Sequence, residues 1–499
     1  MLRFGFDNTY ARDLPGCYVA CQPEAASAPR LLFLNDDLAD ELGLDAAALR
    51  AADAAGLFAG NRLPDDAEPI AQAYAGHQFG GFSPQLGDGR ALLLGERVDR
   101  LGQRRDIAFK GSGRTPFSRN GDGKAAVGPM LREVLIGEAM HALGIPTTRA
   151  LAVAATGDPV WRERPLPGAV LTRVAASHLR VGTFEFFAAR GDLDRLRQLA
   201  DYTIARHDPD LVGAPGRYLG LLRAVAARQA ALVAQWMNVG FIHGVMNTDN
   251  TTISGETIDF GPCAFIEAYD PSTVFSSIDH GGRYAFGNQP RIVRWNLARF
   301  AEALLPLQAN AEDEAEIRQA VLQASEVIDT FPVDYTAAWR RGQHAKLGLS
   351  GPVSPDDATL ADDWLALLET QSVDFTLAWR WLADAADGRP QALRALFADA
   401  PALDAWLARW QARCAGDQAG AAPSPQRAAM MRRVNPVVIP RNHRVEEALA
   451  AATDNDDLGP FERLLAALRR PFDQGSALTP YAEPAPAAVT ACYRTFCGT

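Results

Sequence analysis

Two short segments near the middle of the chain concentrate side chains that are suited to chemistry. The first, His243-Gly-Val-Met-Asn-Thr-Asp-Asn250, is followed by Ile258-Asp-Phe-Gly261. Carboxylate and amide oxygens are ligands that Mg²⁺ accepts, and a carboxylate also accepts a proton from a hydroxyl group. Asn250 and Asp259 are therefore candidate metal ligands, and Asp249 is a candidate proton acceptor.

The order of these residues matches the nucleotide-binding loops of kinase-like phosphotransferases. Those loops place an Asp two residues after a His, an Asn further along, and then Asp-Phe-Gly. His243, Asn250 and Asp259 fall into this register, but Val245 occupies the place of the catalytic Asp and cannot accept a proton. The pattern predicts binding of a metal–nucleotide complex and puts ordinary phosphoryl transfer in question. The alternative is a turn that happens by chance to be followed by Asp-Phe-Gly. That would account for the tripeptide alone, but not for His243, Asn250 and Asp259 together at the expected positions.

A cation and a carboxylate upstream extend the pattern. Lys110 ends an apolar run that is typical of a strand, and Glu133 lies in the helical segment that follows. Kinase-like folds use such a Lys to hold phosphates and such a Glu to orient the Lys. Taken singly, each residue would be better explained as a solvated surface group. The turn Gly87-Asp-Gly89-Arg90 is able to bring backbone N–H groups close to an anion.

The same region is rich in cations although the chain is acidic. Guanidinium groups pair bidentately with phosphate, so these cations together predict a closed phosphate clamp, whereas a charged loop by itself is usually a solvated face. The cations are Arg90, Arg114, Arg119, Lys124, Arg132, Arg173 and Arg180.

The elements that must position these residues are strands first and helices afterwards. Apolar runs at 90–96, 106–110, 150–154 and 169–174 predict strands, and the Gly- and Ser-rich stretch 111–128 predicts a long loop. Apolar residues at helical spacing predict a helix over 131–143 and another over 221–236 that ends at Gly240. From about Asn288 onward we expect helices, with breaks near 348–355 and 419–425.

This order predicts an α+β, protein-kinase-like bilobal fold with a helical C-terminal extension. We expect an irregular and helical lead-in at 1–70, a strand-rich lobe at 71–176, a helical lobe with the catalytic loop at 177–300, and the extension at 301–499.

Bulk properties narrow the partners. A net charge of -11 argues against non-specific binding of nucleic acid, which depends on Lys and Arg. No apolar run is long enough to span a bilayer, and the N-terminal residues fit neither a secretory signal nor a transit peptide. We therefore expect a cytoplasmic protein that does not bind membranes.

Taken together, the motifs of this chain resemble the SelO (YdiU) family of pseudokinase protein adenylyltransferases, and the resemblance runs nearly from end to end. The resemblance is carried by motifs at Tyr74-Ala-Gly-His-Gln-Phe-Gly80, Gln85–Arg90, Lys110–Arg119, Gly121–Lys124, Leu143–Ala150, His243–Asn250, Asp279–Tyr284, Asn435–His443 and Phe496–Thr499.

The resemblance implies transfer of AMP from ATP to Ser, Thr or Tyr hydroxyls of proteins, with ATP flipped relative to kinases. The implied nucleotide contacts are Gly87, Gly89, Arg90, Lys110, Asp122, Gly123, Arg173, Arg180 and Asp259. Asn250 and Asp259 would hold Mg²⁺, Asp249 would accept the proton, and Glu133 would support Lys110. Uridylyl transfer from UTP with Mn²⁺, and an atypical kinase, are the alternatives.

Cysteines raise one further question. The spacings of Cys17 with Cys21 and of Cys492 with Cys497 do not match a zinc knuckle, and Cys497 is a candidate redox thiol. The resemblance implies a tail cysteine that pairs with a cysteine beyond Asp-Phe-Gly. Here Cys263 is the only cysteine nearby, and 269–280 contains none.

Overall fold

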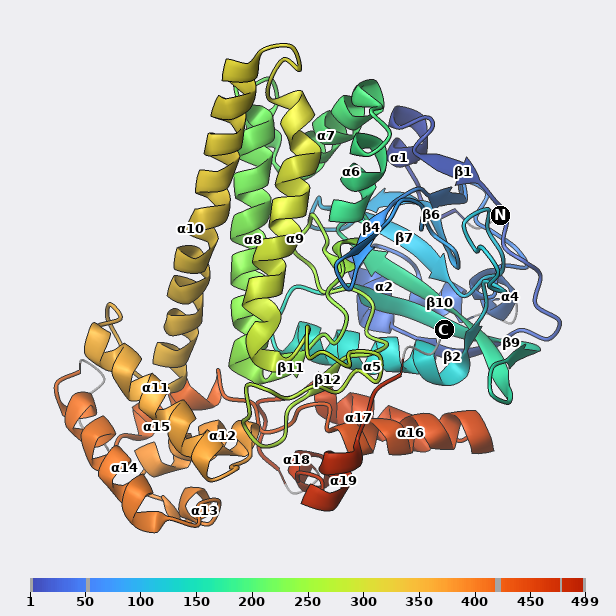
Figure 1. The fold of residues 1–499 in the computed structure, drawn as a ribbon. Helices are drawn as coiled ribbons and strands as arrows, with labels where there is room; N and C mark the ends of the chain where they lie inside the picture. The colour runs from blue at the N-terminus through green and yellow to red at the C-terminus, as the bar shows by residue number, and fades with distance from the viewer. Residues whose placement is uncertain (1–2, 51–53, 418–422, 476–477, 497–499) are drawn as a thin grey trace.

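The computed structural model describes residues 3–50, 54–417, 423–475 and 478–496, and within them the chain is strand-rich first and helical afterwards (Figure 1). An eight-stranded sheet has the order β1-β3-β6-β7-β10-β9-β2, with β8 paired to β10. Its strands are β1 (Tyr18–Ala20), β2 (Arg30–Leu34), β3 (Ile70–Gln72), β6 (Ala91–Val98), β7 (Arg104–Lys110), β8 (Ala125–Ala126), β9 (Arg149–Trp161) and β10 (Pro165–Ala175).

The register of the sheet places two of the predicted cations side by side. Lys110 at the end of β7 lies opposite Ala91 of β6 and Leu171 of β10. Arg173 follows on β10, opposite Ala108. The strands predicted at 90–96, 106–110, 150–154 and 169–174 are confirmed.

Helix α5 (Val127–Ala142) packs against β9 and β10 and carries Glu133. The sequence predicts this helix from 131, but it begins at Val127, directly after β8. It ends where predicted, because Gly144 takes a positive φ of 76° that residues with a Cβ rarely adopt. Except for β8 and this first turn, the stretch 111–128 is the predicted loop.

The helical part is built around α8 (Arg217–Val239), which confirms the helix predicted over 221–236 and ends at Gly240 with φ 78°. Helices α9 (Gln289–Leu304) and α10 (Glu314–Lys346) pack beside it (Figure 1). The short strands β11 (Phe241–Ile242) and β12 (Ala264–Phe265) flank the catalytic-loop segment. Helices α6 (Val181–Ala188) and α7 (Leu193–His207) precede α8.

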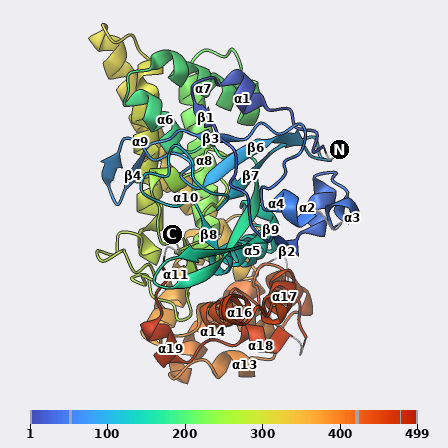
Figure 2. The ribbon, with the colours of Figure 1, turned by 90° about the vertical axis from the view of Figure 1, so that its right-hand side faces the viewer.

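The last part of the chain is helical, and only its later helices return to the side of the sheet. Its helices are α11 (Pro355–Thr370), α12 (Phe375–Ala386), α13 (Gln391–Arg394), α14 (Ala400–Ala415), α15 (Pro425–Arg432), α16 (Asn442–Asn455), α17 (Gly459–Leu468), α18 (Thr479–Ala482) and α19 (Ala487–Cys492). Helices α16 and α17 pack against α5 (Figures 1 and 2). The break predicted at 348–355 is confirmed, whereas residues 418–422 of the other predicted break lie outside the described residues.

The segment 1–70 differs from the expected irregular and helical lead-in. It contains α1 (Thr9–Asp13), α2 (Asp36–Glu41), α3 (Ala46–Leu49) and α4 (Ala54–Phe58), but also β1 and β2, the two edges of the main sheet. Three-residue and five-residue strands give too little periodicity to be recognised from sequence. None of the described helices is both long and apolar enough to cross a bilayer.

Candidate active site

A cavity of about 380 Å³ brings the predicted residues together from the sheet, α5, the hairpin of β4 (Gly76–Gln78) and β5 (Gly81–Ser83), and the catalytic loop. Its lining includes Tyr74, Gln78, Phe79, Asp88, Gly89, Arg90, Lys110, Glu133, Arg173, Arg180, Val245, Asn247, Asp249, Asn250, Asp259 and Ile278. We call Lys110, Arg173, Arg180 and Asp259 the cationic end, and Asp249 with the β4–β5 hairpin the hairpin end.

Lys110 is held between two carboxylates at the cationic end. Its Nζ donates to Glu133 Oε1 at 2.9 Å and to Asp259 Oδ1 at 2.5 Å. Glu133 Oε1 also accepts the backbone N–H of Phe260 at 3.0 Å, so one oxygen joins the Lys to the Asp-Phe-Gly segment. The side chains of Lys110 and Glu133 are each only 5% exposed, so this pair is kept away from water and its geometry is fixed.

Asp259 adopts φ 63°, a left-handed conformation that Asp tolerates better than most residues. Its Oδ1 accepts a second bond from Arg173 Nη1 at 2.9 Å. Burial alone would raise the pKa of Asp259, but the charges of Lys110, Arg173 and Arg180 hold it well below its usual value. The carboxylate is therefore ionised across the physiological pH range.

Arg173 is anchored from behind by a chain of hydrogen bonds. Its Nε donates to His178 Nε2 at 3.2 Å, and His178 Nδ1 lies 3.0 Å from Asp106 Oδ2. Burial lowers the pKa of His178 to about 4, so the imidazole is neutral at pH 7 and Nε2 is free to accept. Asp106 also pairs with Arg206.

Arg180 and Arg90 supply the remaining positive charge. The Arg180 guanidinium lies 4.5 Å from the centre of the Tyr74 ring, and within the described part of the chain its buried Nε has no hydrogen-bond partner. Arg90, which follows the Gly87–Gly89 turn, is half-buried on the cavity wall. Arg90, Lys110, Arg173 and Arg180 thus gather on one part of a wall that also carries Asp88, Glu133 and Asp259. Several guanidinium groups on one wall suit a polyanion.

The hairpin end places Asp249 on the cavity wall. Gln78 Nε2 donates to Asp249 Oδ2 at 3.3 Å, while Oδ1 is buried and has no hydrogen-bond partner among the described residues. Burial raises the pKa of Asp249 to about 6, against the opposing charge of Arg180. Its neighbour Asn250 donates from Nδ2 to the carbonyl of Val245 at 3.0 Å. Asp249 thus has one oxygen bonded to Gln78 and the other buried beside Gly76.

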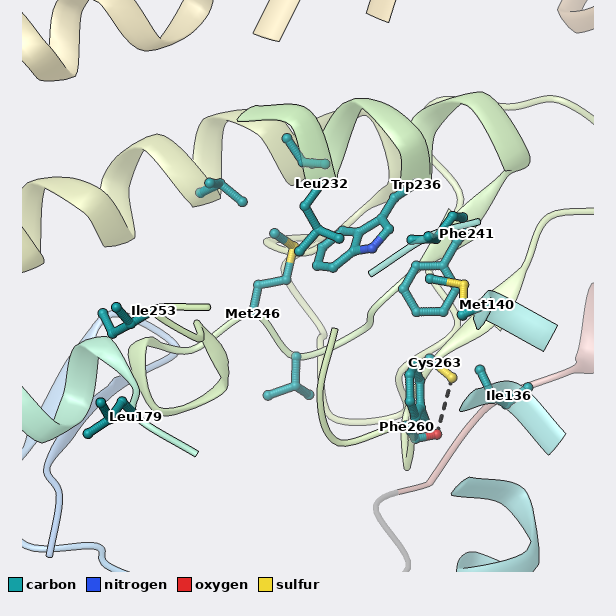
Figure 3. Close-up of a cluster of buried hydrophobic side chains, with 14 of the residues drawn as sticks. Ile136, Met140, Leu179, Leu232, Trp236, Phe241, Met246, Ile253, Phe260 and Cys263 are labelled. Atoms are coloured by element: carbon teal, nitrogen blue, oxygen red, sulfur yellow. Dashed lines mark hydrogen bonds between the residues drawn. The ribbon is translucent and has the colours of Figure 1, made fainter. Parts of the chain in front are cut away.

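Hydrophobic packing fixes the loop that carries these groups. Trp236 of α8 packs against Phe241, and Phe241 in turn against Phe260 of Asp-Phe-Gly (Figure 3). Ile136 and Met140 of α5 belong to the same buried cluster (Figure 3). The side chain of Phe260, which follows Asp259, is therefore packed between α5 and α8. His243 adds a bond from its ring Nε2 to the carbonyl of Ile258 at 2.9 Å.

Comparison with known proteins identifies the family. A family model described as "Protein adenylyltransferase SelO" matches residues 2–469. The chain belongs to the SelO family. A relative from Chromobacterium violaceum is 61% identical over 486 residues, which cover 97% of this chain and 100% of that protein. Relatives from Cereibacter sphaeroides (strain ATCC 17029) and Mycobacterium sp. (strain KMS) are 60% and 57% identical over 499 residues, covering both chains fully.

Each of these three relatives bears the name "Protein nucleotidyltransferase YdiU". The resemblance drawn from the sequence motifs is therefore confirmed, and so is the class of enzyme: this SelO-family chain is a nucleotidyltransferase.

Most residues that the sequence nominates for this SelO-family site line the cavity, and three do not. Those on its wall are Gly89, Arg90, Lys110, Glu133, Arg173, Arg180, Asp249, Asn250 and Asp259. Gly87 lies just behind, where a Cβ would stand 2.3 Å from the ring of Phe117. Asp122 pairs with Arg162 at 2.8 Å, and Gly123 packs against the backbone of Gly113. Nucleotide contacts by all of the nominated residues stay predictions.

Two of the other predicted cations, Arg132 and Lys124, do not line this cavity. Arg132 binds the carbonyls of Phe260 and Cys263 and pairs with Glu446, so it braces Asp-Phe-Gly instead of facing the cavity. Lys124 pairs with Glu24 at 3.4 Å. Cys263 is buried, its Sγ 3.1 Å from the carbonyl of Phe260 (Figure 3), and Cys497 lies outside the described residues.

Sequence reasoning gave no role to the cavity residues of the Tyr74–Gly80 motif. Tyr74, Gln78 and Phe79 all line the cavity, as does Ile278 from the segment after β12. The signal was available, because the motif joins a His, an amide and aromatic residues between glycines. What was missing was a contact that tied it to the catalytic loop.

Proposed function

We propose that this enzyme transfers AMP from ATP to Ser, Thr or Tyr hydroxyls of proteins, with ATP flipped relative to kinases. The observation that carries the proposal is the division of the cavity. Its cationic end suits a triphosphate, its hairpin end carries the Asp249 carboxylate, and Val245 stands where a kinase has its base.

In the proposed reaction, the Asp249 carboxylate accepts the proton of the acceptor hydroxyl as its oxygen attacks the α-phosphorus. The bond from the α-phosphorus to the oxygen that bridges to the β-phosphorus breaks, and pyrophosphate leaves with that bonding pair. Lys110, Arg173 and Arg180 are placed to stabilise the charge that develops on the leaving group. A pKa of about 6 leaves most Asp249 side chains ionised at pH 7.5 and ready to accept a proton.

We further propose that Asn250 and Asp259 hold Mg²⁺, with Mn²⁺ as the alternative. Both offer hard oxygen donors of the kind these ions take. The amide nitrogen of Asn250 is engaged by Val245, which leaves its oxygen for the ion. Asp259 Oδ1 is taken by Lys110 and Arg173, whereas Oδ2 accepts no hydrogen bond from the described residues. The bound ion would neutralise phosphate charge during transfer.

The arrangement also supports a protein-kinase-like reading of the fold, with lobes at 71–176 and 177–300. The Lys110–Glu133 contact joins a strand to the helix beside it, as the corresponding pair does in kinases. Asp259 reaches the same Lys from the segment before β12.

The deciding experiment compares ATP labelled at the α-phosphate with ATP labelled at the γ-phosphate. The purified enzyme is incubated with Mg²⁺ and a mixture of soluble bacterial proteins, and label in protein is counted. We expect label from the α-phosphate only, accompanied by release of pyrophosphate.

Each other outcome has its own meaning. Label from the γ-phosphate alone would replace the proposal with a kinase, and label from neither, with nucleotide still bound, with a scaffold. Faster labelling from α-labelled UTP with Mn²⁺ would indicate uridylyl transfer. Asp259→Ala serves as the inactive control, because it removes a proposed metal ligand together with the partner of Lys110 and Arg173.

A further inference from the structure

The β4–β5 hairpin stands apart from the main sheet (Figure 2) and is bonded to the catalytic loop. The backbone N–H of His77 donates to Thr248 Oγ1 at 2.7 Å, and that of Phe79 donates to Asn247 Oδ1 at 3.1 Å. Gly76 lies so close that a Cβ there would stand 2.6 Å from Asp249 Oδ1. The hairpin tip is therefore fixed at the edge of the cavity, beside the proposed proton acceptor.

Phe79 at this tip has a backbone conformation that needs a reason. Its φ of 51° lies in the left-handed region, which Gly or Asn adopts readily and an aromatic residue rarely. The ring is 39% exposed and touches Tyr284, with 5.0 Å between ring centres. Strained residues of this kind concentrate at functional sites. Glycine would adopt this turn without strain. The chain instead has an aromatic residue there, whose ring lies at the mouth of the cavity.

Ile278 completes the rim, and Arg283 lies beside the hairpin tip. Ile278 lines the same cavity and is 47% exposed. The Arg283 guanidinium lies 3.7 Å from where a Cβ on Gly80 would stand, and within the described part of the chain it forms no ion pair with a carboxylate. The mouth beside Asp249 thus offers an apolar platform and, next to it, a positive charge.

We propose that Phe79, Ile278 and Arg283 form the acceptor subsite of this enzyme. It would take an extended protein segment with an apolar side chain beside the acceptor hydroxyl and a carboxylate further along. This inference rests on the proposed transfer to protein hydroxyls. With the acceptor hydroxyl at the Asp249 carboxylate, neighbouring residues of an extended segment lie about 3.3–3.6 Å apart along the chain. The nearest of them meet the hairpin tip, where Phe79 and Ile278 leave apolar surface uncovered.

The test uses Ser-centred peptides that differ only in Leu or Ser beside the acceptor and in Asp or Asn beyond it. Peptide binding is measured by fluorescence anisotropy in the presence of ATP and Mg²⁺, and transfer by α-phosphate label. Phe79→Gly should raise the Kd and KM of Leu peptides about 10-fold or more, because the apolar contact is lost. It should change Ser peptides by less than about 2-fold and leave ATP affinity unchanged. Arg283→Gln should remove the preference for Asp over Asn.

Phe79→Gly is also the safest variant for folding, because glycine relaxes the positive φ and the backbone bond to Asn247 is kept. Its thermal midpoint should equal or exceed that of the parent protein. Trp161→Ser, which removes another exposed aromatic ring outside the cavity lining, should change neither class of peptide.

Equal effects of Phe79→Gly on Leu and Ser peptides, or no effect on either, would overturn the inference even if transfer proceeds normally. If peptides bind in a Phe79-dependent way but α-phosphate label is never transferred, the subsite stands and the proposed function fails. The binding and transfer measurements therefore separate the two failures.

Discussion

The two ends of the cavity treat charge in opposite ways. At the cationic end, Lys110 and Arg173 both bind Asp259, and Glu133 and His178 hold these two cations from behind. At the hairpin end, the described residues give the Asp249 carboxylate one long hydrogen bond, from Gln78, and no partner for its buried Oδ1.

The contrast indicates a division of labour. Paired buried charges keep their geometry without a ligand, so the cationic end is preorganised to bind and to stabilise charge. An uncommitted buried carboxylate oxygen is costly unless a substrate group completes it. Binding should therefore depend on the cationic end, and the rate of the chemical step on the hairpin end.

Removing the Asp249 carboxylate tests this division most strongly. We expect Asp249→Ala to lower kcat by about 10²–10⁴-fold, the usual contribution of a positioned base, while the Kd for ATP changes little. Single-turnover transfer of α-phosphate label gives the rate, and calorimetric titration with ATP and Mg²⁺ gives the affinity.

Asp210→Ala is the matched control, because Asp210 is an exposed carboxylate outside the cavity lining. It should behave as the parent enzyme does. If Asp249→Ala instead lost ATP affinity at nearly unchanged turnover, Asp249 would belong with the metal ligands, and the division between the two ends would be wrong.

The cationic end was more predictable from sequence than the hairpin end, and the reason is local. Lys110, Glu133 and Asp259 sit on a strand, a helix and a tripeptide whose patterns are visible in short windows. The sheet core and α8 were predictable for the same reason, because period-two and helical spacings are strong in them.

The role of the hairpin depends on long-range contacts that no window contains. His77 bonds Thr248, and Phe79 bonds Asn247, although these partners lie far apart in the sequence. The left-handed φ of Phe79 has no sequence signature. Likewise β1 and β2 are strands only because β3 and β9 offer them edges.

At the cationic end, Glu133→Gln sharpens the comparison with a smaller effect. The amide keeps an oxygen for Lys110 and Phe260 but loses the charge that holds Lys110 in one geometry. We expect kcat/KM for ATP to fall by up to about 10²-fold, mostly through KM. Steady-state kinetics over a range of ATP concentrations separate the change in kcat from the change in KM.

Glu446→Gln is a useful comparison, because Glu446 pairs with Arg132 on the other side of Asp-Phe-Gly and its side chain is 51% exposed. It should change kcat/KM little. A fall in kcat alone for Glu133→Gln would indicate that the pair acts on the chemical step and not on binding.

The smallest effect on activity is expected behind the cationic end, at His178. Gln at this position removes the titrating group and still offers an oxygen to Arg173 Nε, so at pH 7.5 His178→Gln should lose only a few-fold in kcat/KM. His178→Phe, which leaves that donor buried and unpaired, should lose more. Comparable losses in both variants would mean that the shape of the imidazole matters and its acceptor role does not.

The same residue predicts how stability depends on pH. The pKa of His178 is about 4 in the folded chain, below its ordinary value of 6.5, so the unfolded chain takes up the proton first as the pH falls. The free energy of unfolding should therefore decrease between pH 6.5 and 4, by on the order of 3 kcal/mol from this group. The pKa of Asp106 is lowered to about 2, so its contribution is lost only below that window.

Urea unfolding at pH 7 and pH 4.5 should show a smaller decrease in the free energy of unfolding for His178→Gln than for the parent protein. An equal decrease in both would mean that His178 is protonated in the folded state, and then its Nε2 could not accept the bond that anchors Arg173.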